Sequence, residues 1–142
     1  MIRALELAKY ILKKSDKDLS NLELQKTLYF TELDYIKEFD KHLICDDFEA
    51  WKYGPVVREV YYEYRNYGAN SIDKPEKEII SEKLTKKELD IINQSIDKCN
   101  QESYWNLVEK SHREGGAWDK SFKEDKKEII NKKLLKDEAK SQ

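Results

Sequence analysis

Residues that interrupt regular structure are scarce in this chain of 142 residues, which has only four glycines and two prolines. Because glycine and proline mark turns and end helices, their scarcity favours a chain built largely of helices. Charged residues make up 39% of the chain, as is typical of helices with solvated outer faces, and aromatic residues at 11% supply large side chains to bury. We therefore expect an all-α or mostly helical fold in a single domain rather than a disordered chain.

Cysteine is equally scarce. Cys45 and Cys99 are far apart in sequence and form no CxxC pair, so neither a disulfide framework nor a zinc site is indicated. Two free thiols, both expected to be buried, fit a reducing compartment. No window approaches the ~20 apolar residues of a membrane-spanning helix, and the first residues lack the apolar region of a signal peptide. These absences predict a soluble, cytoplasmic protein with no membrane partner.

The chain also has no large excess of charge of either sign, because its 27 basic and 29 acidic residues nearly balance and give a net charge of −2. Binding of single-stranded nucleic acid needs a basic groove around stacking aromatics. Glu49, Glu59 and Glu63 offset the basic residues that lie near the richest aromatic segment. We therefore expect no direct nucleic-acid partner.

The common catalytic and cofactor motifs are absent, including HExxH, the P-loop, GxGxxG and GxSxG. His112 and Glu114 form an HxE pair as in zinc deaminases, but the PCxxC segment that completes such a site is missing. A lone histidine at a helix end is more often structural or a partner of the helix dipole. The sequence predicts no catalytic residue, no metal and no cofactor; an enzyme that uses Glu49 and His112 is the weaker alternative.

Apolar residues at helical spacing and three capping-box patterns predict about six helices in a compact bundle. The capping boxes begin at Ser20, Thr85 and Ser121. The expected helices cover residues 2–14, 20–39, 56–67, 85–99 and 103–115, and a last helix begins at 121; a short extended segment lies near 44–53. Residues 69–84 are expected to form a loop that includes an extended piece at 79–80. The domain is predicted to span 1–136, followed by a frayed tail at 137–142.

The segment Phe48–Val57 combines large aromatic residues with a Gly-Pro corner. Gly54 can adopt backbone angles that are closed to other residues. Pro55 suits the first position of the helix expected to follow, and Gly68 is placed to end that helix.

Tyrosine and tryptophan gather in and after this segment, at Trp51, Tyr53, Tyr61, Tyr62 and Tyr64. These residue types give large contact areas at low entropic cost and dominate protein interfaces. Tyr62 lies about 100° around the helix from Tyr61 and is expected to be exposed. Two interpretations stay open: the aromatics belong to an ordinary core, or they form a core with a partner-binding surface at its edge.

Three motifs carry a resemblance to a known family. They are Leu24-Gln25-Lys26-x-Leu28-Tyr29-Phe30, then Phe48-Glu49-Ala50-Trp51-Lys52-Tyr53-Gly54-Pro55-Val56-Val57-x-x-Val60-Tyr61, and Tyr104-Trp105-x-Leu107-x-x-x-Ser111-His112-x-Glu114-x-x-x-Trp118. With Tyr67-Gly68 and Leu84-Thr85 between them, they resemble the SocA-like antitoxin domain, also called the Panacea domain, over roughly residues 1–135. One departure is Gly115-Gly116-Ala117 before Trp118, where the family frequently has a proline.

The resemblance implies a compact helical domain with no known catalytic activity, typically encoded beside a toxin in bacteria, phages and prophages. It implies an antitoxin that neutralises a cognate toxin by direct protein–protein binding. The alternative that the resemblance offers is an adaptor that delivers the toxin to an ATP-dependent protease, which would then be a second partner.

Family motif positions and the aromatic pattern together define the candidate toxin-binding or motif residues. They are Glu49, Trp51, Tyr53, Gly54, Pro55, Val57, Tyr61, Tyr62, Tyr64, His112 and Trp118, and the family motif also includes Gln25 and Lys26. Glu49 and His112 are hypothesised to form a buried or semi-buried hydrogen-bonded pair that ties the central motif to the C-terminal helix, which ends near His112.

Overall fold

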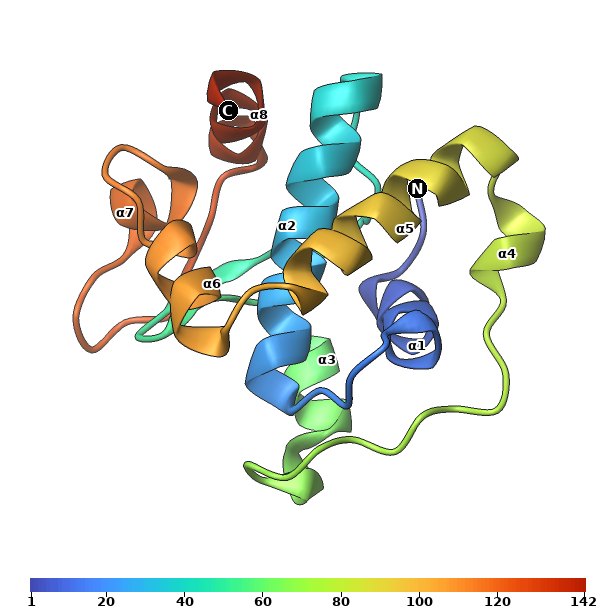
Figure 1. The fold of residues 1–142 in the computed structure, drawn as a ribbon. Coiled ribbons are helices and arrows are strands. Elements are labelled where there is room, and N and C mark those ends of the chain that lie inside the picture. Colours follow the sequence, from blue (N-terminus) through green and yellow to red (C-terminus); the bar gives the residue numbers. More distant parts are fainter.

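The structure is a computed structural model that describes all 142 residues. It contains eight α-helices, one 3₁₀ helix and one three-stranded antiparallel sheet, which confirms the prediction of a mostly helical fold. Helix α2 (Asn21–Phe39) runs through the middle of the molecule (Figure 1). Helices α1 (Ala4–Lys14), α5 (Lys86–Asn100) and α8 (Lys132–Ser141) pack against it. None of the helices combines the length and the apolar composition that a membrane-spanning segment requires.

Two of the predicted capping boxes begin the helices that form this centre. The Ser20 hydroxyl accepts a hydrogen bond from the backbone N–H of Glu23, and the Glu23 carboxylate accepts one from the backbone N–H of Ser20. Thr85 and Glu88 make the same reciprocal bonds at the start of α5. These bonds satisfy backbone donors that a helix leaves free, so the local sequence alone places both helix starts.

The Gly-Pro corner belongs to a β-hairpin rather than to a helix start. Strands β1 (Glu49–Trp51) and β2 (Gly54–Val56) pair antiparallel, and β3 (Glu128–Ile129) joins the other edge of β1. This confirms an extended segment near 44–53. Pro55 was expected to begin a helix, and this is wrong because it lies in edge strand β2, where a missing N–H is tolerated. Helix α3 begins only at Arg58 and ends at Glu63.

The chain after α3 tightens into a 3₁₀ helix, η1 (Arg65–Tyr67), and Gly68 ends it with a φ of 59°. Gly68 therefore lies at the predicted stop. The extended piece expected at 79–80 is instead the start of a short helix, α4 (Ile80–Lys83). Ile80 is fully buried in the main core, so tertiary packing decides its conformation.

The last third of the chain departs furthest from the predictions. Helix α6 (Tyr104–Ser111) begins after the Ser103 cap as expected, but it ends at Ser111, with His112 as its C-cap, rather than at the glycines. Trp118, expected in a loop, lies in α7 (Ala117–Ser121). No helix begins at the Ser121 capping pattern, because residues 128–129 pair with β1 instead, and α8 begins after the Asn131 cap.

Residues 137–142, which we expected to form a frayed tail, instead continue α8 as far as Ser141. Glu138 is 3% exposed, and its Oε1 accepts hydrogen bonds from the Tyr29 hydroxyl at 2.6 Å and the Ala117 backbone N–H at 2.7 Å. Ala139 is fully buried in the core. The predicted domain limits of 1–136 stay a prediction, but the segment beyond them contributes to the packing around α2 and α7.

Removing residues 138–142 should therefore lower the free energy of unfolding by about 2–5 kcal/mol, because two buried donors lose their acceptor. Removing only Ser141 and Gln142 leaves those bonds in place and should change the stability by less than about 0.5 kcal/mol. Urea denaturation of both truncated chains checks this. Equal stabilities would show that the end of α8 contributes nothing to the fold.

Candidate partner-binding site at the β-hairpin

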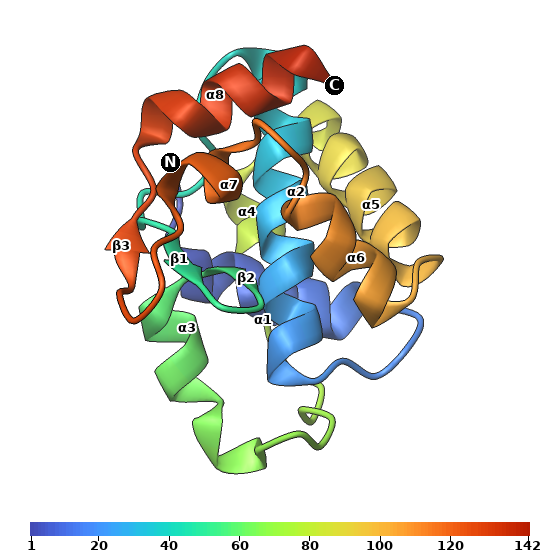
Figure 2. The same ribbon diagram turned by 90° about the vertical axis from the view of Figure 1, so that its left-hand side faces the viewer.

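A cleft of about 1080 Å³ lies where the β-hairpin meets α2, α3 and the loop that precedes β3. Figure 2 shows the hairpin on one face of the molecule, between α3 and the segments α6 and α7. The residues that line this hairpin cleft come from four separate parts of the chain. They are Leu22, Lys26, Trp51, Lys52, Tyr53, Val56, Tyr61, Phe122, Glu124, Asp125, Lys126 and Lys127.

Aromatic rings from the predicted motif form the walls of the hairpin cleft. The rings of Trp51 and Tyr61 pack edge to face with centroids 4.9 Å apart. The Lys127 ammonium lies 4.0 Å from the centroid of the Trp51 ring, a cation–π contact that joins the loop before β3 to the hairpin. Tyr53, in the hairpin turn, is 45% exposed. The walls therefore combine apolar rings with positive charge.

Trp105 extends this aromatic surface beyond the cleft, and our sequence reasoning did not select it as a candidate. It is 66% exposed, and its ring lies 6.5 Å from that of Tyr53 and 5.0 Å from that of Tyr104. A signal was present in the sequence. Leu107 faces the interior, and a residue two positions earlier lies on the opposite side of a helix.

The remaining tyrosines of the motif divide between surface and core. Tyr62 is 43% exposed, as predicted, and the guanidinium groups of Arg58 and Arg65 lie 5.8 Å and 5.3 Å from the centroid of its ring. Tyr64 is half-buried and packs against the main core beside Tyr67. Tyr61 lines the cleft, so these tyrosines are not all part of an ordinary core, and the partner-binding surface stays a prediction.

Glu49 connects the first strand to α3. Its carboxylate accepts hydrogen bonds from Arg58 Nε at 2.9 Å, from a terminal Arg58 nitrogen at 2.8 Å, and from Trp51 Nε1 at 2.9 Å. Burial alone would raise the pKa of Glu49, but the bonds from Arg58 and Trp51 outweigh it and lower the pKa. Glu49 is therefore ionised at neutral pH, and it fixes the hairpin against α3.

His112 does not meet Glu49, and the hypothesised pair between them is wrong. The His112 ring stacks on Trp118 with centroids 3.6 Å apart and planes 7° from parallel. Trp118 is buried, stacks on Phe122, and donates a hydrogen bond from Nε1 to the Trp51 carbonyl at 2.7 Å. Burial and the nearby charge of Lys26 lower the pKa of His112. Trp118 therefore makes the connection that we had assigned to the Glu49–His112 pair.

The second strand is held against α2 by two buried polar side chains. Gln25 Oε1 accepts a hydrogen bond from the Val57 backbone N–H at 2.9 Å. The Lys26 ammonium lies 3.4 Å from the Pro55 carbonyl oxygen. Gly54 permits this close approach, because it has a φ of 121° and a methyl group there would lie 2.5 Å from Lys26 Cε. Gly54, Pro55 and Val57 thus have structural roles, as the residues that seat the hairpin on α2.

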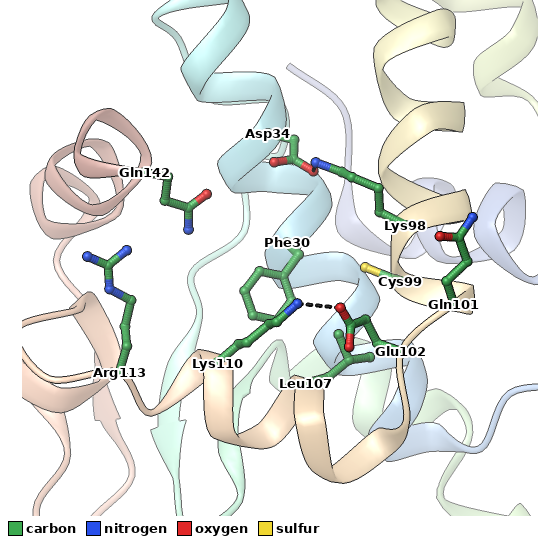
Figure 3. A pocket seen from close by; sticks show the side chains of 10 residues that line it. All are labelled: Phe30, Asp34, Lys98, Cys99, Gln101, Glu102, Leu107, Lys110, Arg113 and Gln142. Atoms are coloured by element: carbon green, nitrogen blue, oxygen red, sulfur yellow. Dashed lines mark hydrogen bonds and ion pairs between the residues drawn. The ribbon is translucent and has the colours of Figure 1, made fainter.

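A second cavity of about 510 Å³ lies between α2, α5, α6 and the C-terminus (Figure 3). Phe30 from α2 and Cys99 from α5 both line it, and the lining residues Lys110 and Glu102 form an ion pair. Burial raises the pKa of Cys99 to about 12, so this thiol is not a nucleophile at neutral pH. Cys45 is exposed, contrary to expectation. None of the candidate residues from the sequence lines this cavity.

The chain is a small, mostly helical domain, and aromatic residues and lysines line its hairpin cleft. The family model of the antitoxin SocA-like, Panacea domain matches residues 24–119. Antitoxin SocA from Caulobacter vibrioides (strain NA1000 / CB15N) is 33% identical over 120 residues, a match that covers 73% of this chain and 60% of the relative. The chain belongs to the SocA-like antitoxin, Panacea domain family. No solved structure matches it.

The family match contains all but the first three residues of α2, and it contains the hairpin, α3, α6 and Trp118. Of the cleft residues, Leu22 precedes the match, and Phe122, Glu124, Asp125, Lys126 and Lys127 lie beyond its end. One wall of the hairpin cleft is therefore built by the shared domain and the other by a loop outside the match.

Proposed function

We propose that this chain is a cytoplasmic antitoxin that neutralises a cognate toxin by binding it directly through the hairpin cleft and Trp105. Membership of the antitoxin family and the similarity to an antitoxin support the role. The observation that carries the site is the continuity of Trp105, Tyr53 and the aromatic walls of the cleft.

This surface has the composition of a protein interface. Large rings with a polar edge supply most of the binding energy at protein interfaces when a partner removes them from water. A standard interface buries about 800 Å² on each partner, and aromatics in the hairpin, α3 and α6 are close enough to share one. Lys52, Lys126 and Lys127 at the cleft would attract an acidic partner and speed the encounter.

Co-expression with the toxin tests the proposal and the importance of Trp105 together. The wild-type chain should restore growth and co-purify with the toxin. Trp105→Ala should weaken the complex by about thirtyfold, the effect of losing a hot-spot tryptophan, while leaving thermal stability unchanged because the ring is mostly exposed. The affinity of each variant is measured by isothermal titration calorimetry with the toxin and the antitoxin purified separately.

Ile79→Ala is the matched control, because Ile79 is 45% exposed and lies outside the hairpin cleft. It should bind the toxin like the wild-type chain. If both variants lose the same affinity for the toxin, or if Trp105→Ala loses none, the proposed surface is not part of the interface.

The protease adaptor is distinguished by the fate of the toxin in the same cells. Constant toxin levels with a stable complex support neutralisation by binding. Loss of toxin that depends on an ATP-dependent protease would instead support an adaptor, in which this surface holds the toxin and another surface docks the protease. The enzyme alternative has weaker support, because Glu49 is occupied by Arg58 and Trp51 and shares no hydrogen bond with His112.

A further inference from the structure

Lys26 is a buried cation without an adequate partner. Its side chain is fully buried on α2, and its only hydrogen bond is the long one, 3.4 Å, to the Pro55 carbonyl oxygen. An ammonium group has three donors, and buried charges in proteins are normally paired with an anion. None of the ion pairs in the structure includes Lys26. Burial lowers its pKa to about 7.

Packing alone does not explain a lysine at this position. A methionine has a similar length, fills irregular spaces well, and would avoid the desolvation of a charge. The carbonyl of Pro55, itself a buried residue, offers the ammonium only a weak bond of 3.4 Å. A lysine here is useful if its ammonium meets an anion that is absent from the isolated chain.

The position of Lys26 indicates where that anion would enter. Lys26 is one of the residues that line the hairpin cleft, and it belongs to the helix beneath the hairpin. Its flexible four-carbon stem allows the ammonium to move toward an incoming group. A second buried polar atom in this region, His112 Nε2, also lacks a hydrogen-bond partner. The Lys26 ammonium and His112 Nε2, beneath the aromatic walls, could therefore both make further hydrogen bonds to a bound group.

The lining of the cleft favours a singly charged, amphipathic group. Four lysines and two acids line it, which gives a positive excess, while the acids Glu124 and Asp125 disfavour a group with two negative charges. Trp51, Tyr53 and Tyr61 offer surface to an apolar or aromatic neighbour of the anion. No arginine, the usual bidentate partner of phosphate, lines the cleft.

We propose that the hairpin cleft binds a carboxylate flanked by an apolar or aromatic side chain, supplied by an acidic segment of the toxin, and that the Lys26 ammonium pairs with it. This inference rests on the proposed function and specifies the chemistry of the partner at that site. The aromatic walls would exclude water from the ion pair and so strengthen it.

A small probe tests this binding without the toxin. N-acetyl-L-phenylalaninate carries one carboxylate beside an aromatic ring, and N-acetyl-L-phenylalanine amide is its neutral match. Titration is followed by the ¹⁵N resonance of the Trp51 indole, up to about 50 mM because one fragment binds weakly. The acid should bind the wild-type chain saturably, at least about tenfold more tightly than the amide, which corresponds to about 1.4 kcal/mol.

Lys26→Met and Lys26→Gln should each weaken binding of the acid by about tenfold and leave binding of the amide unchanged. Lys87→Met is the matched control, because it removes the same charge from an exposed site outside the cleft. Circular dichroism confirms that each variant is folded. Absence of saturable binding, equal binding of acid and amide, or equal binding by wild type and both Lys26 variants would overturn the proposal. Preferential binding of inorganic phosphate would overturn it in favour of a phosphate site.

The probe separates this inference from the proposed function. If the wild-type chain neutralises the toxin but does not select the acid over the amide, the carboxylate site is wrong and the antitoxin role stands. If the probe binds as expected but the toxin is not neutralised, the cleft chemistry stands and the proposed partner is wrong.

Discussion

Replacing Gly54 with alanine should reduce the free energy of unfolding by roughly 2–5 kcal/mol, combining backbone strain with overpacking. Its φ of 121° is a conformation that side chains rarely adopt. The added methyl group would also lie 2.5 Å from Lys26 Cε and 2.9 Å from Ser111 Oγ. Relief requires either the buried Lys26 side chain or β2 to move, and either movement would weaken the contact between Lys26 and the Pro55 carbonyl. Urea denaturation gives the loss directly.

Gly68→Ala separates the two causes. Gly68 also has a positive φ, of 59°, but a methyl group there would meet nothing within 4 Å. Its substitution should therefore show strain alone, on the order of 1 kcal/mol. If Gly68→Ala and Gly54→Ala are equally destabilised, close packing of the hairpin against Lys26 does not contribute to the requirement for glycine.

Lys26→Met should stabilise the isolated protein below neutral pH, by an amount that shrinks as the pH rises. The pKa of Lys26 is about 7 in the folded state, and an unfolded lysine has a pKa of about 10.4. Between these values the unfolded chain holds more protons, so the wild-type chain gains stability with increasing pH, at up to about 1.4 kcal/mol per unit. Below pH 7 the full penalty of burying the charge is present.

The total change is on the order of 5 kcal/mol, as an upper bound that assumes no relaxation around the charge. Urea denaturation of both chains from pH 6 to pH 10 should show the advantage of methionine declining across this range. Lys87→Met, at an exposed site, should give a constant difference. A constant difference for Lys26→Met as well would mean that the buried lysine titrates normally. A penalty of this size in the free protein is partly recovered if a partner supplies a carboxylate to the ammonium.

Local patterns were sufficient where a helix start depends on a few neighbouring residues. Ser20 with Glu23 and Thr85 with Glu88 form the predicted capping boxes, because both partners lie within one turn of each other. The same pattern at Ser121 predicted a helix start that the structure does not contain. Pairing of Glu128 and Ile129 with β1 is a contact between distant segments, and it overrides the local preference.

Composition and short sequence patterns predicted the helical class, the starts of the central helices, the unusual backbone at Gly54 and the resemblance to the antitoxin family. Each of these depends on composition or on residues close together in the chain. The contact of Trp118, rather than His112, with the hairpin became visible only in the folded structure, as did the wall that the loop of Lys127 adds to the cleft. The tertiary structure also decided that Lys26 is buried beneath that hairpin. These contacts join segments far apart in sequence, where side-chain packing and desolvation outweigh any local signal.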